Sequence, residues 1–223
     1  MPILLHVDAS ARGNRSHTRR LGRLFIEGWR ALRPHDQVIA RDVSRYPPSP
    51  VTEAWVAAAF TKPERRTPAM QMALAESDAL VDELQRADLI LAGVPMYNFG
   101  MPSTMKAYID NIVRVGRTFG FDRSRPDDPY SPMLNAKRLV SLSARGDYGY
   151  APGQRIAHVN HVEPHLESVF AFLGVTELHS VAVEYDEFGD DRLTRSLAEA
   201  EGRVARLVRE ITSGFDEEVT RAA

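Results

Sequence analysis

The chain has 223 residues, enough for one well-buried core, and we expect a single domain over residues 1–223. Its 43% apolar and 26% charged residues exclude a disordered or fibrous protein, and a net charge of −2 gives no electrostatic basis for binding nucleic acid or an anionic membrane. The sequence contains no cysteine, which excludes disulfides, thiolate nucleophiles and cysteine-ligated metal centres.

Short apolar runs alternate with helical patterns along the chain. Five such runs predict strands, at residues 3–7, 37–43, 88–94, 138–143 and 178–185. Between and after them, apolar residues recur at the spacing of amphipathic helices, as in Met105, Tyr108, Ile109 and Ile112. This alternation predicts an α/β fold of the flavodoxin-like kind, with a five-stranded parallel sheet in the order 2-1-3-4-5 and helices on both faces. Ligands of such folds bind beyond the carboxyl ends of the strands, so we look for chemistry after residues 7, 94 and 143.

The segment after the first strand reads DASARGNRSHTRR. Ser10, Ser16 and Thr18 are suitable phosphate ligands at a strand-to-helix turn, where the helix N-terminus adds partial positive charge. Ser16 or Thr18 could equally be an ordinary helix N-cap. Neither G-x-G-x-x-G nor G-x-x-x-x-G-K-[ST] occurs, so a site for a dinucleotide or a nucleoside triphosphate loses its main support, whereas a monophosphate remains compatible.

The segment after the third predicted strand, VPMYNFGM, is a turn between Pro95 and Pro102. Pro102 suits the first position of the next helix, and Gly100 can take a positive φ and lets the main chain approach a ligand closely. Exposed N–H groups beside methionine and aromatic side chains match a flavin ring, which has an apolar side and an edge of hydrogen-bond acceptors.

The longer stretch that begins with this turn, VPMYNFGMPSTMKAYID, resembles the signature of the FMN-dependent azoreductases, which are dimeric flavodoxin-like NAD(P)H:acceptor oxidoreductases. The opening loop and the fourth-strand exit SLSARGDYGY also resemble the flavin loops of that family, over nearly the whole chain. The resemblance implies phosphate contacts from the first loop and ring contacts from the other two. The implied residues are Ser10, Ser16, His17, Thr18, Met96, Tyr97, Asn98, Phe99, Ser143, Ala144, Arg145 and Gly146.

Two departures from the family pattern stand out. Asp147 occupies a place where the family commonly has glycine, and a carboxylate pointing at the flavin edge would repel developing negative charge. His17 replaces a small or amide residue, which leaves only its main-chain N–H as an expected contact. The N–H of Gly146 is the candidate donor to the flavin pyrimidine edge.

The resemblance implies an enzyme in which one FMN per subunit takes a hydride from NADH or NADPH and passes electrons to a quinone or an azo compound by a ping-pong mechanism. It also implies a homodimer, and no catalytic acid or base is predicted. The alternative is a flavodoxin-type electron carrier without NAD(P)H turnover, although such carriers present acidic docking faces and this chain is nearly neutral. A phospho-acceptor domain is excluded, because Pro95 and Met96 stand where its carboxylate belongs.

Other chemistry-bearing residues receive weaker assignments. Phe119 and Tyr148 are candidate substrate-lining residues. A metal site is conceivable at three histidines, His158, His161 and His165. Pro164 fits the first turn of a helix, so His158 and His161 precede that helix and do not share a face with His165, and no metal is expected. The sequence has no signal-peptide pattern and no run of about 18 apolar residues that could span a membrane, so we expect a cytoplasmic protein.

Overall fold

The structure, a computed structural model, describes the main chain of residues 1–222 and the side chains of residues 1–217. Its centre is a five-stranded sheet whose strands are all parallel and follow the order β2-β1-β3-β6-β7. The strands are β1 (Ile3–Asp8), β2 (Gln37–Asp42), β3 (Leu89–Gly93), β6 (Arg138–Ala144) and β7 (Glu177–Val183). These are the five predicted strands in the predicted order, so the expected flavodoxin-like topology is confirmed.

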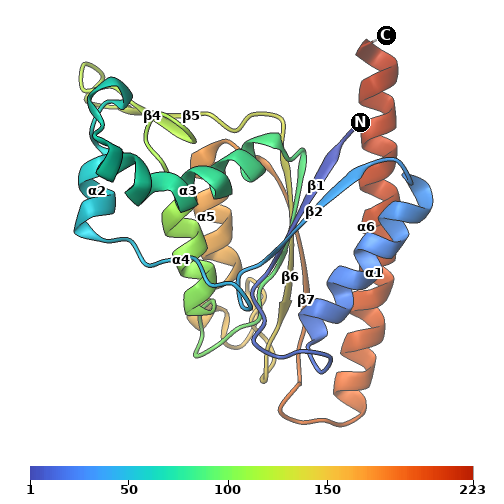
Figure 1. Cartoon of the computed structure of the whole chain (residues 1–223). Helices are drawn as coiled ribbons and strands as arrows, with labels where there is room; N and C mark the ends of the chain where they lie inside the picture. The colour runs from blue at the N-terminus through green and yellow to red at the C-terminus, as the bar shows by residue number, and fades with distance from the viewer. Residues whose placement is uncertain (223) are drawn as a thin grey trace.

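Helices cover both faces of the sheet, as Figure 1 shows. One layer contains α1 (His17–Leu32) and α6 (Asp191–Ala222), and the other contains α3 (Pro68–Arg86), α4 (Ser103–Ile112) and α5 (Glu163–Leu173). Each layer closes its own apolar core: Phe25 and Trp29 pack with Leu207 on the first face, and Tyr108 packs with Phe170 on the second. The central strand β3 is fully buried, which explains its continuous apolar sequence.

Two small additions lie toward the amino ends of the strands (Figure 1). The first comprises α2 (Glu53–Ala59) and the 3₁₀ turn η1 (Pro63–Arg65). Another 3₁₀ turn, η2 (Ala157–Val159), belongs to neither addition and directly precedes α5. The second addition is an antiparallel hairpin, β4 (Phe119–Phe121) with β5 (Tyr130–Pro132), between α4 and β6. Aromatic contacts hold it to α5, since Phe119 lies 5.1 Å from Phe172 between ring centroids.

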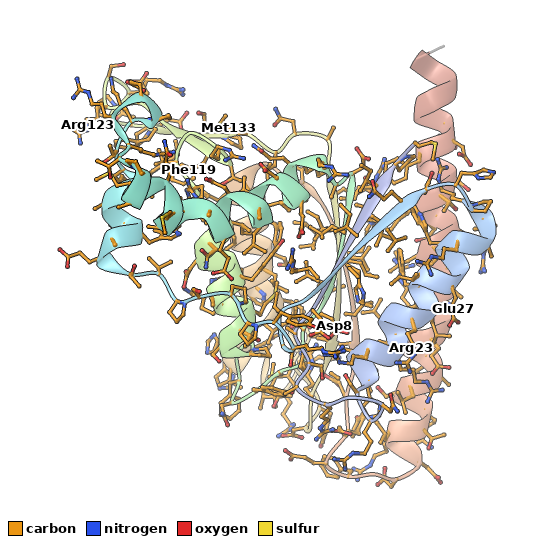
Figure 2. The ribbon with its side chains drawn as sticks, viewed as in Figure 1. Asp8, Arg23, Glu27, Phe119, Arg123 and Met133 are labelled. Carbon is orange, nitrogen blue, oxygen red and sulfur yellow. The ribbon has the colours of Figure 1, made fainter. Side chains whose placement is uncertain are left out.

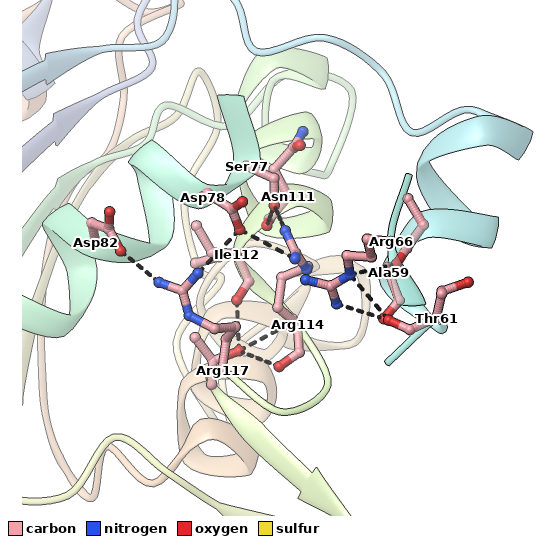
Figure 3. Close-up of polar contacts among 12 residues, drawn as sticks. Ala59, Thr61, Arg66, Ser77, Asp78, Asp82, Asn111, Ile112, Arg114 and Arg117 are labelled. Atoms are coloured by element: carbon pink, nitrogen blue, oxygen red, sulfur yellow. Dashed lines mark hydrogen bonds and ion pairs between the residues drawn. The ribbon is translucent and has the colours of Figure 1, made fainter. Parts of the chain in front are cut away.

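A buried arginine joins α4 to α3 and α2 (Figure 3). The fully buried Arg114 donates to Ser77 Oγ (2.6 Å), pairs with Asp78 (3.2 Å), and lies over the Trp55 ring. Arg117 reaches the same Asp78 carboxylate (3.1 Å). Burying this charge requires its partners, so the cluster fixes the packing of these helices.

Candidate functional site

The carboxyl ends of β1, β3, β6 and β7 surround a cavity of about 400 Å³, a size usual for a small-molecule site. Nine of the twelve residues predicted to contact FMN line it: Ser10, Ser16, His17, Met96, Tyr97, Asn98, Ala144, Arg145 and Gly146. Segments far apart in the sequence therefore meet at one edge of the sheet, as the topology predicts.

The other three predicted residues lie beside this cavity but not on its wall. Thr18 is buried, with its Oγ1 3.0 Å from Ser16 Oγ. Phe99 is 53% exposed, and the hydroxyl of Ser143 donates into the protein, to Glu163. Their predicted contacts with FMN stay predictions.

The first loop leads into the N-terminus of α1. Ser16 is the N-cap, and its Oγ accepts a hydrogen bond from the Arg19 N–H (3.2 Å). Within residues 1–222, the main-chain N–H groups of His17 and Thr18 have no hydrogen-bond partner. The loop therefore presents open N–H groups at the positive end of the helix dipole, an arrangement suited to an anion.

Arg19 fastens this loop from beneath. Its guanidinium donates to the carbonyls of Ser10 (2.7 Å) and Arg12 (2.9 Å) and pairs with Asp8 (3.1 Å) and Asp42 (2.8 Å) at the ends of β1 and β2. Burial raises the pKa of Asp8 in spite of this cation, whereas for Asp42 the hydrogen bonds from Arg19 outweigh burial and lower the pKa. Arg19 thus satisfies two loop carbonyls and fixes the loop against the ends of β1 and β2.

The second loop is a tight turn closed on itself. Tyr97 and Gly100 exchange both main-chain hydrogen bonds (2.8 and 3.1 Å), while Asn98 and Phe99 take φ values of 49° and 69°. Gly100 could take a positive φ, but in the structure the positive φ values fall on the two residues before it, the central positions of a two-residue turn. The N–H groups of Asn98 and Phe99 have no partner within residues 1–222, and the Tyr97 hydroxyl accepts from Ala11 of the first loop (3.2 Å).

The third loop presents Gly146 to the cavity, and its two charged side chains are paired with other side chains. The N–H of Gly146 has no partner within residues 1–222. The buried Arg145 side chain donates to Glu163 (2.6 Å), which neutralises its charge. Asp147 accepts from Arg155 (2.7 Å) outside the cavity, so its carboxylate does not point at a ligand there.

A fourth segment, after β7, lines the same cavity and was not predicted. Asp186 and Glu187 reach it, together with Arg12 and Pro95 of the other loops. The main chain holds the segment against the third loop, since the Asp186 N–H donates to Arg145 O (3.3 Å) and the Glu187 N–H to Gly146 O (3.1 Å). The rule that ligands bind beyond the carboxyl ends of parallel strands predicted the other three loops, and it applies equally to this segment after β7.

The two candidate substrate-lining residues lie elsewhere. Tyr148 stacks on Tyr185 (4.8 Å between centroids) outside the cavity. Figure 2 shows Phe119 near the hairpin, far from Asp8 at the carboxyl end of β1. Within one chain, neither side chain reaches the cavity.

The described side chains contain no cluster of three or more histidine, aspartate or glutamate side chains placed to hold a metal ion. Among the described helices, none is long and apolar enough to cross a membrane.

Comparison with known proteins fits this geometry. The family model described as flavodoxin-like fold matches residues 3–208. FMN-dependent NAD(P)H:quinone oxidoreductase 1 of Pseudomonas aeruginosa is 44% identical, over 94% of this chain and 99% of the relative. FMN-dependent NADH:quinone oxidoreductase 2 of Idiomarina loihiensis is 40% identical, over 95% of this chain and 91% of the relative.

This chain belongs to the flavodoxin-like family of these oxidoreductases. Among solved structures, azoreductase from Bacillus anthracis superposes with a TM-score of 0.84 at 21% identity, over 94% of this chain and 100% of that one. At that identity the likeness concerns the fold, and it agrees with the sheet order. The family resemblance predicted from the three loops is confirmed.

Proposed function

We propose that this member of the family is an FMN-dependent oxidoreductase that passes reducing equivalents from NADH or NADPH to quinones and azo compounds. One observation carries the proposal. One residue from each of three separate loops lines a single cavity of about 400 Å³ at the carboxyl edge of the sheet and has a main-chain N–H without a hydrogen-bond partner within residues 1–222; these are His17, Asn98 and Gly146.

The residues present fit FMN in chemistry as well as in size. The open N–H groups of His17 and Thr18, at a helix N-terminus, suit a phosphate group. Those of Asn98, Phe99 and Gly146 suit the acceptor atoms of a flavin ring. All twelve residues predicted from the sequence remain our proposed contacts, with His17 contributing at least its main-chain N–H.

In the mechanism that we propose, the protein binds and orients the flavin and the substrates, and it excludes water from the cavity. FMN, when bound, supplies hydride acceptance and electron delivery. Pro95 and Met96 give the cavity an apolar wall, and the Gly146 N–H stabilises negative charge at the pyrimidine edge. One cavity serves both donor and acceptor, so we propose that they bind in turn, as ping-pong kinetics requires. We assign no acid–base side chain.

We also propose a homodimer. Phe119 keeps a substrate-lining role only if it reaches the cavity of a second subunit, because within one chain it lies at the other end of the molecule (Figure 2). Light scattering during size-exclusion chromatography measures the mass against 24.9 kDa for one chain. A single domain over residues 1–223 and a cytoplasmic location stay predictions.

An anaerobic titration tests the enzyme against the electron carrier. We expect NADH or NADPH to bleach the flavin absorbance of the purified protein, and a quinone or an azo dye to restore it. A bound flavin that neither nicotinamide reduces would establish the carrier instead. A protein that takes up no FMN when offered an excess would refute both.

A further inference from the structure

Asp186 places a carboxylate in the part of the cavity that we propose for phosphate. Its Oδ2 lies 2.6 Å from Arg12 Nη1, and its Oδ1 lies 2.8 Å from His17 Nε2. Arg12, Ser16, His17 and Asp186 all line the same cavity. Electrostatics alone would not put an anion at such a place, so this residue needs an explanation.

The carboxylate is both ionised and fully engaged. Partial burial acts to raise the pKa of Asp186, but hydrogen bonds from Arg12 and His17 outweigh it and hold the pKa below its ordinary value. Each carboxylate oxygen has one of these two side chains as its partner. An anion that entered beside them would meet a negative charge that already holds Arg12 Nη1 and the His17 ring nitrogen.

The main chain directs Asp186 into this position. The preceding Tyr185 has a φ of 72°, in the left-handed region that an L-residue with a bulky side chain rarely adopts. Stacking on Tyr148 and an edge contact with Phe188 (5.9 Å) hold Tyr185 there. The aspartate is thus aimed at Arg12 and His17 by a fixed turn.

On the basis of the proposed FMN site, we propose that Asp186 determines flavin selectivity. It competes with the flavin phosphate for Arg12 and His17 and so weakens the binding of FMN relative to that of riboflavin. FMN must displace the carboxylate from one or both side chains, whereas riboflavin has no group that needs them. Asp186 acts through these two residues and makes no contact with the reacting atoms.

Flavin titration of the full chain, freed of flavin, tests this selectivity. Quenching of flavin fluorescence gives the Kd of FMN and of riboflavin for the wild type and for Asp186→Asn, which removes the charge and keeps the shape. We expect FMN to bind about fivefold to tenfold more tightly to the variant, the effect of releasing Arg12 from its ion pair and His17 from its hydrogen bond, and riboflavin to bind unchanged. The FMN gain should shrink as salt is raised.

A matched control comes from the same loop. Asp190→Asn removes a carboxylate that pairs with Arg192 outside the cavity, and asparagine caps a helix as well as aspartate does. We expect the FMN-to-riboflavin ratio of this variant to equal that of the wild type. In an Arg12→Gln background, the gain in FMN affinity caused by Asp186→Asn should be about half as large, because one of the two side chains for which carboxylate and phosphate compete is gone.

The outcomes separate this inference from the proposed function. If Asp186→Asn changes both Kd values by the same factor, or weakens FMN, then Asp186 merely supports the loop and the inference is wrong. Circular dichroism shows whether the variant is folded, and FMN release from loaded protein gives the same comparison without the flavin-free form. If the wild type binds neither flavin, the proposed function fails as well.

Discussion

His6, in the middle of β1, should make the stability of the protein fall in mild acid. Its Nε2 is buried without a hydrogen-bond partner among the described side chains, and a Cβ on Gly22 of α1 would lie only 2.8 Å from it. Burial, helped by the positive charge of Arg19, lowers the pKa of His6 from 6.5 to about 4. The folded protein therefore keeps this imidazole neutral at a pH where the unfolded chain protonates it.

The sign and size of the effect follow from proton linkage. His6 contributes its full stability above pH 6.5, and the contribution is lost as the pH falls from 6.5 to about 4. At about 1.4 kcal/mol per pH unit, the complete loss is about 3 kcal/mol, and about 2 kcal/mol is lost by about pH 5. That is a large share of the stability of an ordinary domain.

The substitution His6→Leu removes the titration and keeps an apolar side chain in the strand. Urea unfolding at pH 7.5, 6.0 and 5.0 gives the free energy of unfolding of both proteins. We expect the wild type to lose about 2 kcal/mol more than the variant between the first and last pH. His6→Gln, which does not titrate either, provides the same comparison if leucine packs poorly. Parallel pH profiles of the wild type and both variants would refute the reasoning.

Three further substitutions test the cavity. Gly146→Val puts a Cβ about where the Glu187 carboxylate lies (2.4 Å from Cδ) and fills the cavity wall, so FMN should bind about tenfold more weakly in fluorescence titration. Arg19→Lys keeps the charge but cannot bridge two carbonyls and two carboxylates; we expect about 1–2 kcal/mol less stability in urea and weaker FMN binding, and unchanged affinity would contradict its anchoring role. Asp147→Asn should change the FMN Kd by less than about twofold, because that carboxylate faces Arg155 and exposed pairs contribute little; a large change would place it at the flavin.

The sheet and three of the four cavity segments could be predicted because they depend on local sequence. Strands buried on both faces, such as β3 (Leu89–Gly93), have to be apolar throughout, and parallel strands end at one edge. Small and hydroxylated residues after residue 7, and glycine after residue 143, then mark where the main chain can bind a ligand. Nothing long-range was needed for that step.

What the sequence did not reveal depends on contacts between distant segments. The predicted last strand ran to Tyr185 and so absorbed the start of the segment that carries Asp186, because a tyrosine with positive φ has no sequence signal. That Arg145 turns its charge to Glu163, rather than to a ligand, depends on a residue 18 positions away in the chain. The hairpin at Phe119 forms from two three-residue strands that carry too few residues for a period-2 pattern.

The chemistry of the cavity also explains why no strong nucleotide motif marks it. The proposed donors are main-chain N–H groups, which every residue except proline supplies. The only requirement on the sequence is therefore for residues that allow the main chain to turn toward the cavity. The charged side chains around them are largely paired with one another, as Arg19 is with Asp8 and Asp42, and Arg145 with Glu163. Binding therefore rests on shape and on donors that do not titrate, and the charged pairs decide how the loops are held. In such a site, side-chain identity sets selectivity mainly where a pair can be exchanged for a ligand, and Asp186 with Arg12 and His17 is placed for that exchange.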